Sequence, residues 1–253
     1  MSQRYFLQLS YNGTRYHGWQ VQPNAVSVQE VLEKALSTLL RENVAVVGAG
    51  RTDTGVHATY FILHFDLSKP VPDNFDVVYK LNSFLPEDIA VQRFWSVRNE
   101  AHARFSAVSR TYHYYITQEK DPFSFDTAFR YTLPLDVDKM NLAAKVLFDY
   151  EDFTSFSRLH TDVKTNNCKI YRAEWKREGG KLVFVIQADR FLRNMVRAIV
   201  GTLLKVGKGK LSIDDFRKII DNKDRGAAGA SAPAQGLFLV DISYPDWINS
   251  EKK

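Results

Sequence analysis

The sequence predicts an α+β fold built from two similar halves. Segments in which apolar residues alternate with polar ones have the period of strands, and segments with apolar residues three and four positions apart have the period of helices. In each half these segments follow the order β-α-β-β-α-β, which is the split βαβ or ferredoxin-like arrangement. We therefore expect two ferredoxin-like halves that share a mixed, mostly antiparallel sheet with the helices on one side.

The first half, residues 1–105, begins with a strand over 4–11, where the sequence RYFLQLSY alternates. Ser27 and Glu30 form an S-x-x-E capping box, and apolar residues at helical spacing follow it, which predicts a helix over 28–42. The other expected elements are strands at 44–48 and 60–66, a helix at 74–84 and a strand at 89–97.

The second half, residues 106–245, repeats this order. Gly179 and Gly180 predict a tight hairpin turn between two strands. Ser212 and Asp215 form a variant capping box that predicts the start of an additional helix. The expected elements are a strand at 110–117, a helix at 137–148, strands at 169–177 and 182–189, helices at 191–206 and after Ser212, and a strand at 237–244. We expect the tail, residues 246–253, to be disordered.

Composition indicates a soluble, cytoplasmic protein. The chain has 253 residues and 45% hydrophobic content, enough for a packed core. The single cysteine, Cys168, cannot form an internal disulfide, so a reducing compartment fits. No apolar run is long enough to span a membrane, and the first residues lead directly into a strand rather than a signal peptide.

The positive charge is concentrated in the second half. Formal net charge is +5; residues 1–105 carry 10 basic and 10 acidic residues, whereas residues 106–253 carry 24 and 19. Phosphates attract Lys and Arg, and bases stack on aromatic rings, which form 13% of the chain. The combination favours a nucleic-acid partner, although modest basicity is common in proteins of other classes.

The eleven residues 48–58, GAGRTDTGVHA, contain the strongest candidate for chemistry. Their glycines permit tight turns and close approach of another molecule. In an extended segment Arg51 and Asp53 point the same way, and a nearby cation favours an ionised carboxylate, so Asp53 is a candidate nucleophile or base. The alternative is a structural Asp that caps a turn. The loop matches neither a P-loop nor a dinucleotide-binding fingerprint.

Three arginines, Arg190, Arg193 and Arg197, recur at helical spacing along the predicted helix at 191–206, with Gly201 on the same side. Guanidinium groups bind phosphate or carboxylate through two hydrogen bonds, so this stripe is a candidate anion-binding surface. The alternative is an ordinary solvated helix face.

Aromatic residues provide further candidates. Tyr112, in the strand at 110–117, offers a stacking plane and a phenol for proton transfer, although aromatic strands are common. Arg15, His17 and Trp19 lie in a glycine-bounded loop that suits RNA contact, whereas Trp19 would alternatively anchor this loop on the core. A metal shared by Asp53 and His57 is the least favoured interpretation, since no metal-ligand motif is present.

Taken together, these segments resemble the tRNA pseudouridine synthase A (TruA) family from about residue 4 to 245. The residues that carry the resemblance are YNGTRYHGWQ (11–20), SVQEVLEKAL (27–36), GRTDTGVHA (50–58), HARFSAVSRTYHY (102–114), DFTSF (152–156), FLRNMVRAIVG (191–201) and APAQGLFLVDISY (232–244).

The resemblance implies the pseudouridine synthase fold and an isomerase that converts uridine to pseudouridine in the anticodon stem-loop of tRNA, at the conventional positions 38, 39 and 40. It implies a homodimer and neither metal nor cofactor. Asp53 would be the nucleophile, Arg51 would pair with it and help displace the stacked base, Tyr112 would lie against the target base, and Arg197 would fix the carboxylate. Further expected contacts with tRNA involve Arg15, Trp19, His57, Arg190 and Arg193.

Two other functions remain open at this point. The first is a tRNA-binding protein with the same fold and no chemistry. The second is a metal-dependent phosphodiesterase. A pure binder would tolerate replacement of Asp53, and a phosphodiesterase would lose its activity on chelation.

Overall fold

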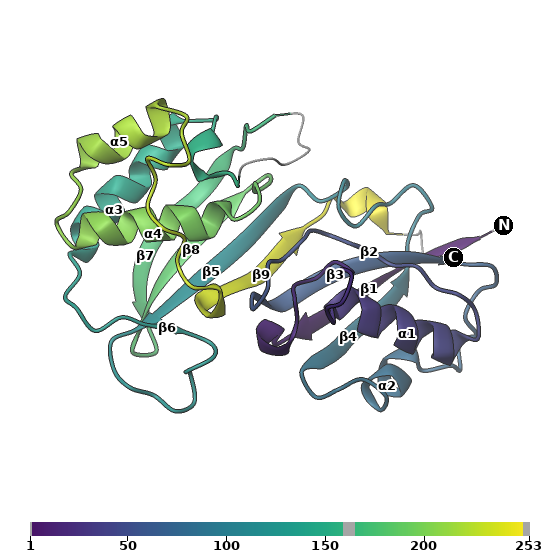
Figure 1. Ribbon diagram of the computed structural model, residues 1–253. Helices are drawn as coiled ribbons and strands as arrows, with labels where there is room; N and C mark the ends of the chain where they lie inside the picture. Colours follow the sequence, from purple (N-terminus) through teal and green to yellow (C-terminus); the bar gives the residue numbers. More distant parts are fainter. Residues whose placement is uncertain (1, 159–164, 250–253) are drawn as a thin grey trace. The chain divides into compact units, whose positions relative to one another are not determined.

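The computed structural model describes residues 2–158 and 165–249 (Figure 1). The chain divides into two compact units, one formed by residues 1–108 with 239–253 and the other by 109–238. The boundary at 108/109 lies close to the boundary expected between 105 and 106. The last strand, β9 (Leu237–Ser243), passes from the second unit into the first.

The first unit follows the expected order of elements. It contains β1 (Gln3–Tyr11), α1 (Val28–Leu40), β2 (Val47–Gly48), β3 (His57–Leu67), α2 (Val77–Asn82) and β4 (Ile89–Ser96). β1 lies between β4 and β3, β2 pairs with β3, and all three pairings are antiparallel. β1 buries apolar side chains on both of its faces, since Phe6 is buried as well as Leu7 and Leu9. α1 buries the apolar face that contains Val28, Leu32, Ala35 and Leu36.

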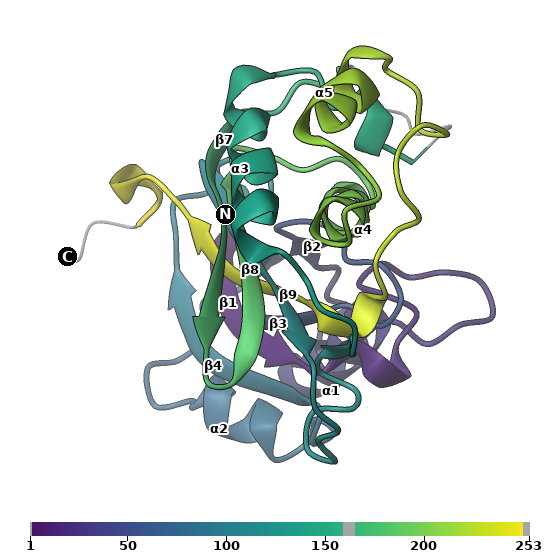
Figure 2. The ribbon, with the colours of Figure 1, turned by 90° about the vertical axis from the view of Figure 1, so that its left-hand side faces the viewer.

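The second unit contains β5 (Ser109–Thr117), β6 (Phe129–Arg130), α3 (Val137–Val146), β7 (Ile170–Glu178), β8 (Lys181–Ala188), α4 (Met195–Gly207) and α5 (Ile213–Asp221). β8 pairs antiparallel with β5 and β7, and β6 adds a short parallel pairing to β5. The three helices lie together on one face of these strands (Figure 2). The predicted α+β class with mixed, mostly antiparallel strand pairing is confirmed.

Local signals in the sequence are also confirmed. The Ser27 hydroxyl accepts a hydrogen bond from the Glu30 amide at 3.2 Å, which caps α1. Ser212 and Asp215 form the reciprocal capping box at the start of α5. Gly179 and Gly180 have φ values of +55° and +76°, as a two-residue hairpin turn between β7 and β8 requires.

The predicted strand at 44–48 is shorter than expected, because β2 covers only Val47–Gly48. Side chains of α1 satisfy the preceding backbone: the Val44 amide donates to Ser37 Oγ at 2.9 Å and the Val46 amide to Glu33 Oε1 at 2.9 Å. Val44 and Val46 are nevertheless buried. Their apolar character therefore reflects packing rather than strand pairing.

The expected helix at 191–206 begins later, at Met195. Asn194 adopts a left-handed conformation with φ of 66°, which interrupts any helix that would include residues before it. Arg190 and Arg193 therefore lie in the connection before α4, and only Arg197 is helical. The prediction of a three-arginine stripe on one helix is wrong.

The expected disorder of the tail is also wrong for its first part. Asp246–Ile248 forms a 3-10 helix, Ile248 is buried, and its carbonyl accepts a hydrogen bond from the Arg98 amide at 3.0 Å. Residues 250–253 lie outside the described part of the chain.

Candidate active site

Asp53 lies in the connection between β2 and β3, and the neighbouring loop 11–20 holds this connection in place. The Trp19 amide donates to the Thr52 carbonyl at 3.2 Å, and the Gly55 amide donates to the Tyr16 carbonyl at 3.4 Å. The Val56 amide donates to the Asp53 backbone carbonyl at 3.1 Å and closes a turn over residues 53–56. The backbone of Asp53 is thus fixed by bonds on both sides.

The two loops approach so closely that glycine is needed at the contact. Gly18 has φ of +88°, and a Cβ there would lie 2.4 Å from the Thr52 carbonyl oxygen. A Cβ on Gly13 would lie 2.0 Å from the Val56 carbonyl oxygen. Any side chain at either position would push the loops apart. The sequence motif YNGTRYHGWQ contains both glycines, but their contact with the Asp53 loop is visible only in the structure.

Trp19 and His57, which we expected to contact RNA, lie in the interior. Trp19 is 3% exposed and stacks on Phe61 with 4.1 Å between ring centroids. His57 is 1% exposed, and its Nδ1 accepts a hydrogen bond from the Gly13 amide at 3.1 Å. Both side chains therefore hold the two loops together. The anchoring interpretation of Trp19 agrees with this placement.

The candidate nucleophile, Asp53, is more exposed than the residues that support it. Thr52 and Val56 are buried, whereas Asp53 is partly exposed and Arg51 is exposed. The Thr52 hydroxyl and the Tyr11 hydroxyl share a hydrogen bond of 2.9 Å, which ties the loop to the end of β1. The result is an accessible carboxylate on a rigid, buried support, the arrangement that a nucleophile requires.

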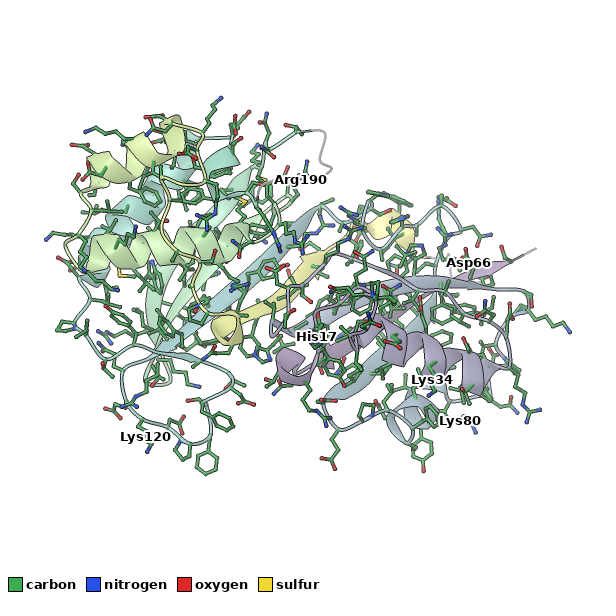
Figure 3. All side chains as sticks on the ribbon, in the orientation of Figure 1. His17, Lys34, Asp66, Lys80, Lys120 and Arg190 are labelled. Carbon is green, nitrogen blue, oxygen red and sulfur yellow. The ribbon has the colours of Figure 1, made fainter. Side chains whose placement is uncertain are left out.

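Arg15 forms an ion pair at the edge of the same loop. Its Nε donates to Asp88 Oδ2 at 2.7 Å, and the Tyr16 hydroxyl donates to Asp88 Oδ1 at 2.6 Å. Burial alone would raise the pKa of Asp88, but the hydrogen bonds from Arg15 and Tyr16 outweigh it and lower this pKa below its ordinary value. The Arg15 side chain remains 68% exposed. His17 is exposed on the same loop (Figure 3).

In the second unit, Tyr112 is half-buried on β5, opposite Ile186 of β8. Phe191 meets its ring edge-on, with 5.2 Å between centroids and an interplanar angle of 89°. This contact fixes the plane of the Tyr112 ring. Phe191 was not among the residues expected at the site, although it lies in the motif FLRNMVRAIVG.

Arg197 is the helical member of the three predicted arginines and is held by the segment 230–233. Its Nε donates to the Ala232 carbonyl at 2.8 Å, and the Ala232 amide donates to the Arg197 carbonyl at 2.9 Å. A Cβ on Gly201 would lie 1.9 Å from the Ala230 carbonyl oxygen, so this glycine permits the segment to cross α4.

Arg190 and Arg193 lie in the connection between β8 and α4, where Figure 3 labels Arg190. Asp189 organises this connection, because its Oδ1 accepts hydrogen bonds from the Arg190 amide at 2.7 Å and the Lys169 amide at 2.8 Å. The Arg193 carbonyl accepts from the Arg158 amide at 3.1 Å, and the Arg193 side chain is exposed.

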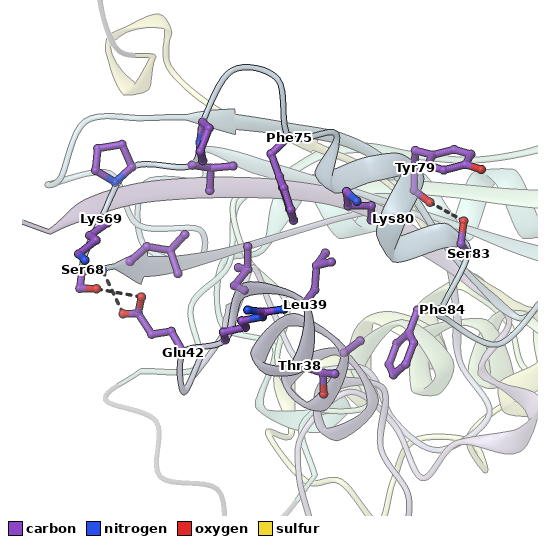
Figure 4. A pocket seen from close by; sticks show the side chains of 17 residues that line it. Thr38, Leu39, Glu42, Ser68, Lys69, Phe75, Tyr79, Lys80, Ser83 and Phe84 are labelled. Carbon is purple, nitrogen blue, oxygen red and sulfur yellow. Dashed lines mark hydrogen bonds between the residues drawn. The ribbon is translucent and has the colours of Figure 1, made fainter.

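A cavity of about 1240 Å³ lies in the first unit. It is lined by α1, α2 and the segment 67–75, with Phe75, Tyr79 and Phe84 among the lining side chains (Figure 4). None of the predicted site residues lines this cavity.

Neither a metal-binding cluster nor a membrane-spanning helix is present in the described residues, 2–158 and 165–249. They contain no group of three or more His, Cys, Asp and Glu side chains arranged to hold a metal ion. None of their helices combines the length and the apolar character needed to cross a bilayer.

Comparison with known proteins identifies the family. A family model described as tRNA pseudouridine synthase matches residues 9–106 and 143–245, which include the Asp53 loop, β7 to α5 and β9. The chain belongs to this family of RNA-modifying enzymes.

Individual relatives are similar in sequence to this chain over almost its whole length. The chain is 60% identical over 247 residues to tRNA pseudouridine synthase A of Bacteroides fragilis, covering 97% of this chain and 98% of that protein. It is 58% identical over 243 residues to the protein of the same name from Parabacteroides distasonis, covering 96% of each. With the Bacillus subtilis protein of that name it shares 42% identity over 240 residues, 93% of this chain and 97% of the relative.

Proposed function

We propose that this protein isomerises uridine to pseudouridine in tRNA, with Asp53 as the nucleophile. The observation that supports this proposal most directly is the partly exposed Asp53 carboxylate on a loop fixed by hydrogen bonds to Thr52, Asp53 and Gly55, in a chain that belongs to the tRNA pseudouridine synthases.

The reaction is an isomerisation that balances without a co-reactant. The bond between C1′ and N1 of uridine breaks, the base rotates, and a bond forms between C1′ and C5. C5 loses its proton and N1 gains one. An ionised carboxylate serves each route to this product, whether by attack on C1′, attack on C6 or assistance in forming a glycal. No redox or hydrolytic step occurs, so the proposed chemistry uses protein side chains alone.

The other predicted residues have proposed roles around this step. Arg51 pairs with Asp53 and helps displace the stacked base. Tyr112 lies against the target base and helps remove the C5 proton, a role that suits a phenol whose ring plane is fixed by Phe191. Arg197 fixes the nucleophilic carboxylate, and its hydrogen bond to the Ala232 carbonyl supports a defined guanidinium position.

We propose the anticodon stem-loop as the substrate region, at positions 38, 39 and 40. A uridine there must be flipped out before reaction, at a cost of a few kcal/mol. Arg15, Arg190 and Arg193 contact the phosphates. The protein acts as a homodimer in the cytoplasm. These details rest on the family resemblance rather than on geometry.

The test is carbodiimide-adduct primer extension on an unmodified tRNA transcript incubated with wild-type protein or Asp53→Asn, with EDTA present. We expect new stops in the anticodon arm with wild-type protein only. Full turnover by Asp53→Asn would contradict the role of Asp53. Binding of tRNA by both proteins without stops across a set of transcripts would favour a non-catalytic tRNA-binding protein.

A further inference from the structure

The motif HARF, residues 102–105, has no role in the proposed mechanism, yet its geometry is unusual. Phe105 is 76% exposed, whereas phenylalanines such as Phe6 and Phe61 lie in the core. The Arg104 side chain is also exposed. Burial of a phenylalanine side chain is normally favourable, so a rigidly held, exposed ring indicates a surface that meets a partner.

The Phe105 ring is supported by its neighbours. The His102 ring lies beneath it with 4.4 Å between centroids and an interplanar angle of 33°. The Arg104 guanidinium carbon lies 5.5 Å from the Phe105 centroid. An aromatic ring, its imidazole support and a cation are therefore presented together.

Hydrogen bonds fix the turn that carries these side chains. His102 Nδ1 accepts from the Arg104 amide at 3.1 Å and from the Phe105 amide at 3.2 Å. The Ser106 amide donates to the His102 carbonyl at 2.9 Å, and the His102 amide donates to Ser106 Oγ at 3.0 Å. Burial, followed by the positive charges of Arg4 and Arg104, lowers the pKa of His102, which favours the neutral ring that these bonds need.

The turn is also anchored to the core of the first unit. The Ala103 amide donates to Nδ1 of the buried His64 at 3.1 Å. The Tyr244 hydroxyl donates to the Ala103 carbonyl at 2.5 Å. Ala103 is thus held on both sides, and its neighbours Arg104 and Phe105 project from a fixed point.

The charge at this turn distinguishes it from the exposed segment that carries Phe123 and Phe125. Phe123 and Phe125 lie in a segment that contains Asp121 and Asp126, which would repel phosphate. Phe105 instead follows Arg104. An aromatic ring beside an arginine is the combination that binds single-stranded nucleic acid, by stacking on a base and pairing with a phosphate.

We propose that Arg104 and Phe105 form a second tRNA-binding element: Phe105 stacks on an unpaired base of the tRNA and Arg104 contacts an adjacent phosphate. The identity of the RNA rests on the proposed function. The element itself rests on exposure, ring support and a turn whose backbone is hydrogen-bonded at each of the five residues His102, Ala103, Arg104, Phe105 and Ser106.

The experiment measures the Kd of an unmodified tRNA transcript by filter binding in an Asp53→Asn background, where binding does not depend on turnover. We expect Phe105→Ala to raise the Kd roughly tenfold, the size typical of one lost base stack. Phe105→Tyr should bind like the parent, and Phe105→Leu should resemble Phe105→Ala. Phe84→Ala is the matched control and should leave the Kd unchanged, since it removes a ring that is also exposed (58%) but lines the cavity beside α2.

Two further measurements separate stacking from charge. Arg104→Ala should reduce the slope of log Kd against log salt by about 0.7 to 0.9, whereas Phe105→Ala should leave this slope unchanged. A fully paired RNA duplex should bind the parent and Phe105→Ala equally, because its bases are already stacked.

An unchanged Kd for Phe105→Ala, or an equal loss on the duplex, would overturn the proposal. So would a change in sedimentation that follows Phe105→Ala, since it would identify the ring as a contact between two copies of the chain. Failure of Phe105→Tyr to restore binding would indicate a structural role. If Phe105→Ala weakens binding while wild-type protein forms no pseudouridine, this inference stands and the proposed function falls.

Discussion

At the scale of single residues, the backbone around Asp53 sets the position of its carboxylate. The Thr52 carbonyl accepts a hydrogen bond from loop 11–20, and the Gly55 amide donates one to it. Gly18 has no side chain, which allows the two loops to approach each other closely. Displacement of a nucleophile by 1 Å is enough to cost about 100-fold in rate. We therefore expect these backbone contacts to be needed for turnover.

Gly18→Ala tests this dependence. The new Cβ would lie 2.4 Å from the Thr52 carbonyl at a φ of +88°, so we expect a loss of about 1–3 kcal/mol in unfolding free energy and a large loss of turnover. Gly50→Ala is the control, because a Cβ there meets nothing within 4 Å. Urea denaturation and single-turnover rates measure the two effects. Equal behaviour of the two variants would show that loop contact does not position Asp53.

His64 makes stability depend on pH. Burial, then the charges of Arg4 and His102, lower its pKa to about 4. Asp66, whose charge acts in the opposite direction, also faces it. Between pH 6.5 and 4 the unfolded chain binds a proton that the folded chain does not, so stability is present above pH 6.5 and is lost as pH falls.

We expect the free energy of unfolding to fall by about 2 kcal/mol from this group between pH 7 and pH 5. Urea denaturation at both values measures the fall. His64→Gln keeps an acceptor for the Ala103 amide but does not titrate, so its loss between the two pH values should be smaller. An identical loss in wild type and variant would assign the pH dependence to other groups.

At the scale of elements, Arg197 depends on how the segment 230–233 crosses α4. Gly201 permits the crossing and the Ala232 carbonyl holds the guanidinium. We expect Arg197→Ala and Gly201→Ala each to reduce kcat at least about tenfold, because the first removes the guanidinium and the second displaces the segment that orients it. Lys205→Ala, on the same helix, should retain activity close to wild type. Comparable losses in all three would reduce the role of Arg197 to general electrostatics.

The elements also show how far the sequence predicts the structure. Periodicity and capping locate β1, α1, β5, α5 and β9 closely, because these signals are local. Residues 44–46 and 190–194 have equally regular patterns but are not in the expected elements. In the first segment, side chains of α1 accept the hydrogen bonds of the backbone amides in place of a neighbouring strand. In the second, Asp189 caps a turn and the left-handed Asn194 prevents a helix from starting earlier. The first cause is a contact between separate elements, which no local pattern encodes, and the second is a left-handed residue that the helical spacing of the arginines does not reveal.

Some features of the candidate site can likewise be predicted from the sequence, and others cannot. Asp53 and its glycine loop are recognisable from the motif, whereas the burial of Trp19 and His57 is not. An aromatic or imidazole ring in a polar loop has the same appearance in the sequence whether it faces solvent or fills the space beneath a neighbouring loop. Contact with Phe61 and Gly13 decides the question in the structure.

At the scale of the whole molecule, we expect the net positive charge to make the affinity for tRNA depend on salt. The chain carries +5, all of it from residues 106–253. We expect the Kd for tRNA to rise roughly tenfold or more between 50 and 200 mM salt, as condensed counterions are released on binding. Filter binding across this range measures the slope. A Kd independent of salt would contradict recognition through phosphates.

The most direct test of the central claim is tritium release from tRNA labelled at C5 of uridine. Formation of the bond between C1′ and C5 expels the C5 hydrogen, so release reports the isomerisation itself. We predict release with wild-type protein, none with Asp53→Asn, and unchanged tRNA affinity in the variant. Release by Asp53→Asn at the wild-type rate would contradict the account, because the fixed carboxylate of the glycine loop would then have no part in the chemistry.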